Sequence, residues 1–520
     1  HFISPVVNLT GKSHVVLSFK YSVSHYDTPY TIGVATRASA SDSWTTVWSK
    51  SPSGDIDPTE LNIKITNTDL GSATFQFCFY FSGKSYNINY WWIDNVMLFE
   101  PYATDARLTK NTVPLYIAQG NTNITGTLNN YGWANINDFT INYRVDSGVN
   151  PGTPHATVIS GVNIVPGGNY NFTCTPPWNI STAGNYKVIE WISDVNSSGK
   201  DSCNANDTIS KVIGVATQTT TCRPVFEEFT SSTCSICVGF NSGTVTPFCN
   251  LYGSQFSLVK YQMDWPGNGD PYFTAEGGAR QAFYKVTGVP ALFVDGRPSG
   301  ETSSSMLNEL NADKAKATFF VISGLTPSYL GNTVTVPITV TPYVTGNLTL
   351  HVIVVEKKTT GNVGTNGETS FNNVMMKMIT GGNGLAIDFV SGVPYSNTFS
   401  FDMTGTHVEE MTDLKVIVFI QENSTKEIYQ SAESEIPLGI QNLTNDNISV
   451  FPNPAYNNVT IKNASGSTIA LYDILGNQLI VKDNINDEFM LDISGLTQGN
   501  YVLKIINGDN ASSRKITIMK

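Results

Sequence analysis

The stretch that decides the fold is Phe226-Glu-Glu-Phe-Thr-Ser-Ser-Thr-Cys234-Ser-Ile-Cys237-Val-Gly-Phe240. Its apolar beginning predicts a short strand, and the two cysteines open a predicted helix. Further along, Thr287-Gly-Val-Pro290-Ala-Leu-Phe-Val-Asp-Gly296 predicts a second strand behind a Val-Pro dipeptide. A strand, a Cys-x-x-Cys at a helix N-terminus and a proline-led strand together predict a redox site.

The two cysteines of this stretch are the predicted reacting groups. A cysteine at a helix N-terminus faces unpaired backbone N–H groups and the positive end of the helix dipole, and both favour the thiolate. Cys234 is therefore the predicted exposed nucleophile, and Cys237, one turn deeper, the predicted resolving thiol. Two alternatives stay open: an inert structural staple, or a zinc site with Cys222 and Cys249. The outer cysteines lack the paired Cys-x-x-Cys spacing of zinc ribbons.

Chain geometry favours a structural disulfide between Cys222 and Cys249 over zinc. A strand from Cys222 to Phe229 rises about 26 Å. A helix from Cys234 to Cys249 returns by about 22–24 Å. Both outer cysteines are thus expected at the far end of the domain, which leaves Cys234 and Cys237 as the redox pair.

The remaining cysteines indicate the compartment. The chain has seven cysteines spread among β-rich segments, which predicts an oxidising environment. Cys174 and Cys203 are expected to cross-link their own domain, although Cys222 competes as a partner. Cys78 is expected to be a lone thiol.

Composition narrows the class of protein. Only 14% of the 520 residues are charged, and the net charge is −12. An acidic chain without a basic stretch does not neutralise phosphates, so nucleic acid is excluded as a partner. No apolar run reaches the ~18–20 residues that span a bilayer, so no transmembrane segment is expected. The start at His1, without an initiator methionine, predicts a mature or truncated form.

Length and patterning predict a multi-domain, mostly β protein with one α/β domain. Period-two alternation, as at Leu17-Ser-Phe-Lys-Tyr-Ser-Val23, predicts half-buried strands in most segments. The predicted domains are a jelly-roll-like module, an immunoglobulin-like sandwich, a thioredoxin-like domain, a second immunoglobulin-like sandwich and a small β tail, at residues 1–101, 102–216, 217–323, 324–440 and 441–520.

The end of the first module has a recognisable pattern. Tyr90-Trp-Trp-Ile-Asp94-Asn-Val-Met-Leu98 resembles the last strand of jelly-roll modules of the MAM and cleaved-adhesin type. Such modules often bind carbohydrate or a structural calcium ion. The resemblance implies Asp94 as a calcium ligand, although one carboxylate does not supply the six to eight oxygens that calcium takes. An aromatic core with a capped strand is the alternative interpretation.

The tail carries the most specific motifs of the chain. It contains Phe451-Pro-Asn-Pro454, Leu471-Tyr-Asp-Ile-Leu-Gly476, Leu496-Thr-Gln-Gly-Asn-Tyr501 and a terminal lysine. In this order they resemble the type A C-terminal sorting domain of cargo for the type IX secretion system of Bacteroidota. The resemblance implies that residues 446–520 engage the secretion machinery, and that the protein is secreted or displayed at the cell surface outside the outer membrane.

The redox stretch also has relatives. After the stretch from Arg223 to Cys234 come, in order, Asp270-Pro-Tyr272, Gly277-Gly-Ala-Arg280, Tyr284 and Gly288-Val-Pro-Ala-Leu-Phe-Val-Asp-Gly296. With these residues the chain resembles thioredoxin-like folds and, over residues of about 222–440, the outer membrane protein 28-related family of the same phylum. The resemblance implies Glu228 as the buried acid that takes the proton of the resolving thiol, and a cis Val289–Pro290 peptide beside the sulfurs. Two features depart from thioredoxins: Thr233 replaces the tryptophan before the first cysteine, and Asp264–Tyr284 adds a loop near the site.

Two functions follow from these features. The first is a thiol–disulfide oxidoreductase that acts on exported or surface proteins through Cys234 and Cys237, with a redox-active disulfide and no cofactor. The second is a non-enzymatic adhesin whose β-modules bind glycan or host matrix, with a structural thioredoxin-like domain.

Overall fold

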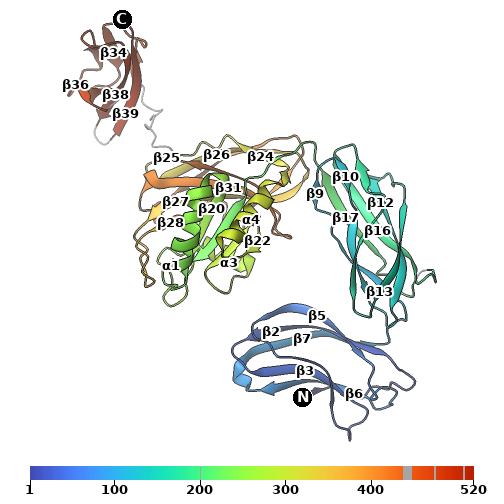
Figure 1. Cartoon of the computed structure of the whole chain (residues 1–520). Coiled ribbons are helices and arrows are strands. Elements are labelled where there is room, and N and C mark those ends of the chain that lie inside the picture. The colour runs from blue at the N-terminus through green and yellow to red at the C-terminus, as the bar shows by residue number, and fades with distance from the viewer. Residues whose placement is uncertain (200, 437–447, 474–475, 508–509) are drawn as a thin grey trace. The chain divides into compact units, whose positions relative to one another are not determined.

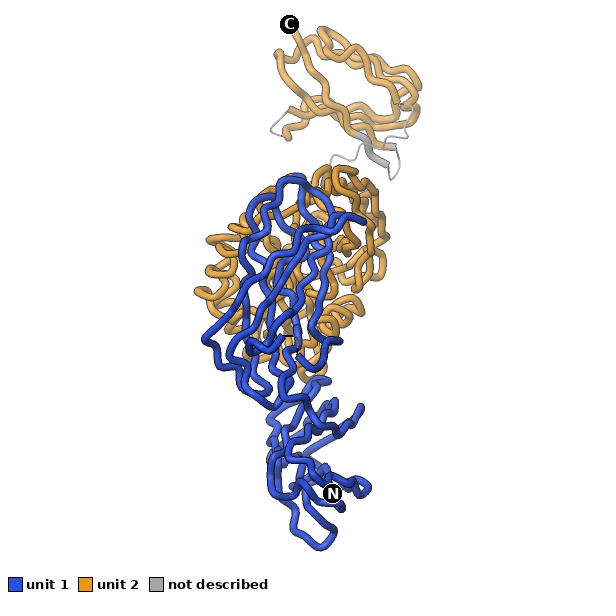
Figure 2. Tube along the Cα trace, turned by 90° about the vertical axis from the view of Figure 1, so that its right-hand side faces the viewer, with its two compact units in different colours: residues 1–217 blue, residues 218–520 orange. Residues whose placement is uncertain are grey.

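The computed structural model describes residues 1–199, 201–436, 448–473, 476–507 and 510–520. Strands hold 52% of the residues and helices 9%, so the prediction of a mostly β chain is confirmed. The chain divides into two compact units, residues 1–217 and residues 218–520 (Figure 2). The finer division into five domains stays a prediction.

The first module of unit 1 is built from two sheets. One has the strand order β5-β2-β7 and the other β1-β6-β3-β4. The predicted alternation is present, because Leu17, Phe19, Tyr21 and Val23 are all buried. The strands are β1 (Phe2–Ile3), β2 (Val15–His25), β3 (Tyr30–Arg37), β4 (Thr45–Lys50), β5 (Ile56–Ile65), β6 (Gln76–Gly83) and β7 (Ile88–Phe99).

The rest of unit 1 contains a five-stranded sheet, β13-β12-β16-β17-β9, with smaller sheets β14-β11-β8 and β10-β15. Its strands are β8 (Ala106–Asn111), β9 (Tyr116–Ile117), β10 (Gly120–Thr122), β11 (Thr125–Asn130), β12 (Ile136–Ser147), β13 (His155–Ile164), β14 (Asn169–Thr173), β15 (Trp178–Ile180), β16 (Gly184–Val195) and β17 (Thr208–Val215).

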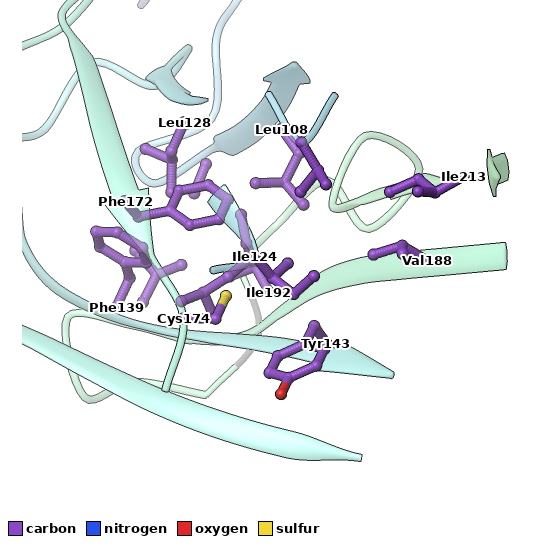
Figure 3. Close-up of a cluster of buried hydrophobic side chains, with 14 of the residues drawn as sticks. Leu108, Ile124, Leu128, Phe139, Tyr143, Phe172, Cys174, Val188, Ile192 and Ile213 are labelled. Carbon is purple, nitrogen blue, oxygen red and sulfur yellow. The ribbon is translucent and has the colours of Figure 1, made fainter. Parts of the chain in front are cut away.

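Cys174 lies in the core between these sheets as a free thiol. Its side chain is 1% exposed and lies in an apolar cluster with Phe139, Phe172 and Ile192 (Figure 3). Cys203 is half-buried, and both thiols are free. The predicted cross-link between Cys174 and Cys203 is therefore wrong, because the first sulfur points into the core. Cys78 is a buried free thiol, as predicted.

Unit 2 is organised around one nine-stranded sheet. Its order is β22-β21-β19-β20-β28-β27-β31-β32, and β29 pairs with β27 (Figure 1). Strands from before and after residue 323 thus share a sheet, joined where β20 pairs with β28 at Lys260 and Val374. The strands are β19 (Val225–Thr230), β20 (Ser257–Gln262), β21 (Ala291–Val294), β22 (Arg297–Ser299), β27 (Gly346–Thr359), β28 (Phe371–Met378), β29 (Leu385–Phe389), β31 (Leu414–Gln421) and β32 (Ile428–Glu435).

The helices follow individual strands of this sheet. After β19, one helical stretch consists of α1 (Cys237–Phe240), a π-helical turn (Asn241–Val245) and α2 (Thr246–Tyr252). Helices α3 (Ala275–Tyr284) and α4 (Ser303–Lys314) follow later. Both begin at a threonine, Thr274 and Thr302, whose hydroxyl accepts a hydrogen bond from a backbone N–H of the first turn. Such N-caps satisfy donors that the helix leaves unpaired.

The other strands of unit 2 before the tail form two small sheets, β24-β26-β25 with β30 against β26, and β18-β23. They are β18 (Thr220–Thr221), β23 (Ala317–Thr318), β24 (Phe320–Ser323), β25 (Ser328–Leu330), β26 (Thr333–Pro342) and β30 (Tyr395–Asp402).

The tail has a core of its own, in which Leu471, Leu491 and Tyr501 are buried. Its sheets have the orders β33-β34-β37 and β36-β35-β38-β39. Within the predicted tail, residues 441–447 and the Ile474-Leu475 part of the turn motif lie outside the described residues. The strands are β33 (Ser449–Phe451), β34 (Asn458–Lys462), β35 (Thr468–Tyr472), β36 (Gln478–Lys482), β37 (Glu488–Asp492), β38 (Gly499–Asn507) and β39 (Asn510–Ile518).

Candidate redox site

The side chains of strand β19 point alternately to the two faces of the sheet. Phe226 packs with Phe240 and Phe248 of the helical stretch, whereas Phe229 packs with Tyr284 of α3. Successive side chains of a strand point to opposite faces. Glu228, in phase with Phe226, therefore lies on the side of the Cys-x-x-Cys helix, and Glu227 lies on the α3 side.

Cys234 and Cys237 form a disulfide with a Cα–Cα distance of 5.3 Å. The backbone N–H of Cys237 points at Cys234 Sγ, with 3.1 Å between nitrogen and sulfur. The prediction that Cys234 is exposed is wrong: its side chain is 3% exposed and that of Cys237 is 0% exposed. Ile236 between them is instead 68% exposed, since the turn that leads into α1 directs it outward.

Pro290 lies beside the disulfide. The Val289–Pro290 peptide is cis, as predicted. The carbonyl oxygen of Val289 is 3.4 Å from Cys234 Sγ. Pro290 also lines an open groove of about 460 Å³ with Ile236 and Phe240. A backbone edge and an apolar surface thus flank the sulfurs, as contact with an extended peptide requires.

Glu228 is buried with a single cationic partner. Its side chain is 0% exposed, and Oε2 lies 3.0 Å from Lys260 Nζ of β20. The same ammonium donates to Asn241 Oδ1 at 2.6 Å, and Asn241 donates to the Thr230 hydroxyl at 3.2 Å. Burial raises the pKa of Glu228 above its ordinary value, and the charge of Lys260 partly offsets this rise. A carboxyl with a raised pKa suits proton transfer nearer neutral pH.

The adjacent Glu227 is saturated with partners. Arg280 donates to both of its oxygens, at 2.7 and 2.9 Å. The hydroxyls of Tyr261 and Tyr284 donate to it at 2.8 and 2.5 Å. Gln421 completes the network by accepting from Arg280 at 2.9 Å. These groups have no access to the disulfide side of the sheet, so this network holds α3 against the sheet.

Two loops hold the turn that carries Cys234. The inserted loop supplies Asp270, which accepts from Ser232 N at 2.9 Å, and Pro266 O, which accepts from the Thr233 hydroxyl at 2.6 Å. The loop between β27 and β28 supplies Asn366, whose side-chain amide donates to Ser231 O and Cys234 O, both at 3.3 Å. The predicted loop near the site is therefore present, and a second loop adds to it.

The predicted pairing of Cys222 with Cys249 is wrong, because both are free thiols. Cys222 Sγ lies 3.9 Å from Asp295 Oδ2 and 3.8 Å from Tyr429 O. Cys249 lies instead against the cluster of Phe226 and Phe248. Burial raises the pKa of Cys249 to about 11. The two thiols thus sit among different neighbours, and neither joins the disulfide in a zinc site.

Asp94 is exposed on β7, where Oδ1 accepts from the backbone N–H of Asn95 at 2.7 Å. Across the described ranges, no group of three or more His, Cys, Asp or Glu side chains is arranged to hold a metal ion. The donor set at Asp94 does not fit the oxygen-rich shell of calcium. Calcium there stays a prediction without structural support.

Sequence reasoning missed Lys260, Asn241 and Asn366. Lys260 had a usable signal, because it is surrounded by Leu258, Val259 and Tyr261 within β20, and a lysine among such residues has to find a buried partner. Asn366 had none, since its hydrogen bonds form across a long stretch of chain. Only the tertiary structure brings it to Cys234.

The fold and the site define a mostly β, multi-sheet protein with a disulfide of Cys-x-x-Cys spacing. Residues 449–519 match the family described as a secretion system C-terminal sorting domain. The chain therefore carries a type IX secretion sorting domain, which implies contact with that machinery and export to the cell surface or secretion. No helix in the described parts of the chain is long and apolar enough to cross a membrane.

Solved structures give weaker similarity. HBP35 of Porphyromonas gingivalis is 14% identical with a TM-score of 0.35, over 57% of this chain and 99% of that chain. A protein from Agrobacterium tumefaciens is 16% identical with a TM-score of 0.32, over 42% of this chain and 97% of that chain. None of the curated protein sequences matches this chain. At these values the solved structures assign no activity to it.

Proposed function

We propose that this exported protein is a thiol–disulfide oxidoreductase that acts on exported or surface proteins through Cys234 and Cys237. The observation that carries the proposal is the disulfide between them, which has the carbonyl of Val289 beside Cys234 Sγ. A buried acid, Glu228, paired with Lys260, lies on the face of β19 that packs against the helical stretch. A structural staple needs neither a peptide-contacting edge nor a buried acid on the helix side of the sheet.

The order of elements supports a thioredoxin-like domain. Strands β19 and β20 are parallel with the helical stretch between them, and β21 and β22 run antiparallel beyond β19. The resemblance to the outer membrane protein 28-related family, which covers this region and the following β-strands, fits the same interpretation.

In the proposed reaction, the Cys234 thiolate attacks one sulfur of a substrate disulfide. A mixed disulfide forms, and the other substrate sulfur leaves as a thiolate that takes a proton from solvent. The Cys237 thiol then gives its proton to the Glu228 carboxylate and attacks Cys234 Sγ. This step releases the reduced substrate and forms the 234–237 disulfide, which an external dithiol returns to the reduced state. The N–H of Cys237 stabilises negative charge on Cys234 Sγ.

The proposal is tested by redox titration and by trapping. Cys237→Ser removes the resolving thiol, so substrates are expected to accumulate as mixed disulfides on Cys234. The matched control, Cys234→Ser, is expected to trap none. A reduction potential well below roughly −300 mV, as structural disulfides have, together with no trapped partner would contradict the proposal.

A second candidate function is adhesion through the N-terminal module. On β7, Tyr90 and Trp92 are 59% and 55% exposed, and their rings stack with centroids 4.8 Å apart. Exposed amphipathic rings are suited to contacts with sugar or protein surfaces. Removal of residues 1–216 or the change Trp92→Ala would then abolish binding to glycan or matrix surfaces. Unaltered binding by both variants would rule this candidate out.

A further inference from the structure

A cavity of about 370 Å³ lies between the helical stretch and the beginning of β28. Its inner wall is formed by Thr230, Asn241, Lys260 and Gln262. Its outer wall is the segment 367–372. The volume falls within the range of small-molecule sites in proteins. The cavity is separate from the groove along Pro290, since the two share only Val238 of α1.

Gln262 is the unusual residue of this cavity. Its side chain is 2% exposed, and within the described ranges neither its amide nitrogen nor its amide oxygen has a hydrogen-bond partner. Leaving a buried polar group unpaired costs about 1–3 kcal/mol. A native protein satisfies such a group with water or with a ligand.

The inner wall offers mostly hydrogen-bond donors. The Lys260 ammonium has three N–H groups, of which one faces Glu228 Oε2 and one is donated to Asn241 Oδ1. Gln262 adds its NH₂ group and a single acceptor. The Thr230 oxygen accepts from Asn241, which leaves its own O–H to donate. Because the Lys260 charge is already paired with Glu228, the groups left for a ligand are donors, namely the third N–H of Lys260 and the amide of Gln262. Donors of this kind favour a ligand end that only accepts.

We propose that this cavity binds a carboxylate, held by Lys260 and Gln262. The outer wall carries Glu368, whose carboxylate accepts from Asn366 at 2.7 Å. The negative charge of Glu368 disfavours polyanions. It favours a ligand with a single carboxylate at the inner wall and a cationic or hydrogen-donating group near the outer wall. A free amino acid and the C-terminus of a peptide both have that chemistry. The inference rests on the cavity and shares only Lys260 with the proposed redox reaction, so carboxylate binding and thiol–disulfide exchange are measured separately.

Titration calorimetry on the full chain tests the site with L-alanine, tri-alanine and tri-alanine amide. Binding of either carboxylate is expected, with at least tenfold weaker binding of the amide because the charge is lost. Tighter binding of L-alanine would identify a free amino acid as the ligand class, and tighter binding of tri-alanine a chain end. Equal binding of acid and amide, or no heat from any probe, would overturn the proposal and leave water as the occupant.

A pair of variants locates the site. Gln262→Leu keeps the volume and removes the amide, so the affinity for the carboxylate is expected to fall about tenfold. Ser242→Ala is the control: it lines the same cavity, but its hydroxyl already donates to Val238 O at 2.6 Å. Its affinity is expected to change by less than about twofold. If Gln262→Leu folds poorly, the comparison of acid and amide on the unaltered protein decides alone.

Discussion

Glu227 and Glu228 are neighbours on β19 and both are fully buried, yet they differ in how many hydrogen-bond donors surround their carboxylates. Glu227 has both oxygens bound by Arg280 and adds two tyrosine hydroxyls. Glu228 has one close cation, Lys260, 3.0 Å from Oε2, and within the described residues neither of its oxygens receives a well-aligned hydrogen bond.

The difference separates a structural carboxylate from one that is free to exchange a proton. The oxygens of Glu227 are all committed to donors of Arg280, Tyr261 and Tyr284. A carboxyl with an open oxygen keeps room for a proton, and burial raises the pKa of Glu228 accordingly. Identical side chains thus acquire different roles because a strand sends neighbours to opposite faces.

The largest effect is expected on the Glu227 side. Arg280→Met leaves Glu227 as an uncompensated buried charge, which is expected to lower the free energy of unfolding of unit 2 by about 3–5 kcal/mol. Denaturant titration of the full chain measures this loss. Glu276→Gln is the control on the same helix, because its partner Lys377 is partly exposed and such pairs contribute at most about 1 kcal/mol. Equal losses for both variants would contradict a special role of the Glu227 network.

The second largest effect is expected on the rate of the proposed reaction when Glu228 is replaced. Glu228→Gln removes the proposed proton acceptor and is expected to slow the attack of Cys237 on a mixed disulfide about 100-fold. Glu227→Gln is the matched control and is expected to leave this rate within about twofold while lowering stability. Stopped-flow kinetics with a preformed mixed disulfide on Cys234 gives the rate. An unchanged rate in Glu228→Gln would show that the two glutamates do not differ in this way.

The pH dependence of that step is expected to follow the ionisation of Glu228. Glu228 accepts a proton only when ionised, and its pKa is raised, chiefly by burial. The rate is therefore expected to rise with pH above the ordinary range of a glutamate and to level off once Glu228 has lost its proton. Because Lys260 lowers this pKa, Lys260→Met is expected to move the rise to higher pH. A shift to lower pH would contradict the assigned charge interaction.

The free energy of unfolding is expected to change with pH in the opposite direction to the rate. Since the native state retains the Glu228 proton at pH values where the unfolded chain has lost it, stability falls as pH rises above the ordinary glutamate pKa. Glu228→Gln is expected to remove that part of the fall, which denaturant titrations at a series of pH values detect.

The smallest effect concerns the loop that holds Cys234. Asn366→Ala removes the hydrogen bonds to Ser231 O and Cys234 O, which is expected to weaken this turn by about 1 kcal/mol. Hydrogen exchange of residues 231–237 should then quicken about fivefold, while exchange in α3, on the Glu227 side, stays unchanged. Faster exchange in both regions would indicate a global loss of stability instead.

Much of this site is visible in the sequence. The spacing of Cys234 and Cys237 predicts a disulfide, Val289–Pro290 is cis as the resemblance implies, and period two assigns Glu227 and Glu228 to opposite faces. The predicted pairings of Cys222 with Cys249 and of Cys174 with Cys203 failed. Lengths of strand and helix bring residues to the same end of a domain, but they do not decide which neighbours a side chain faces.

The sequence by itself determined the mostly β composition, the sorting tail and the Cys-x-x-Cys spacing, because strand periodicity and short motifs are local properties of the chain. The tertiary structure alone decided that strands on both sides of residue 323 share one sheet. It also placed Lys260 next to Glu228 and brought Asn366 to Cys234. These pairings join distant parts of the chain, and they depend on which faces pack together, which no local pattern encodes.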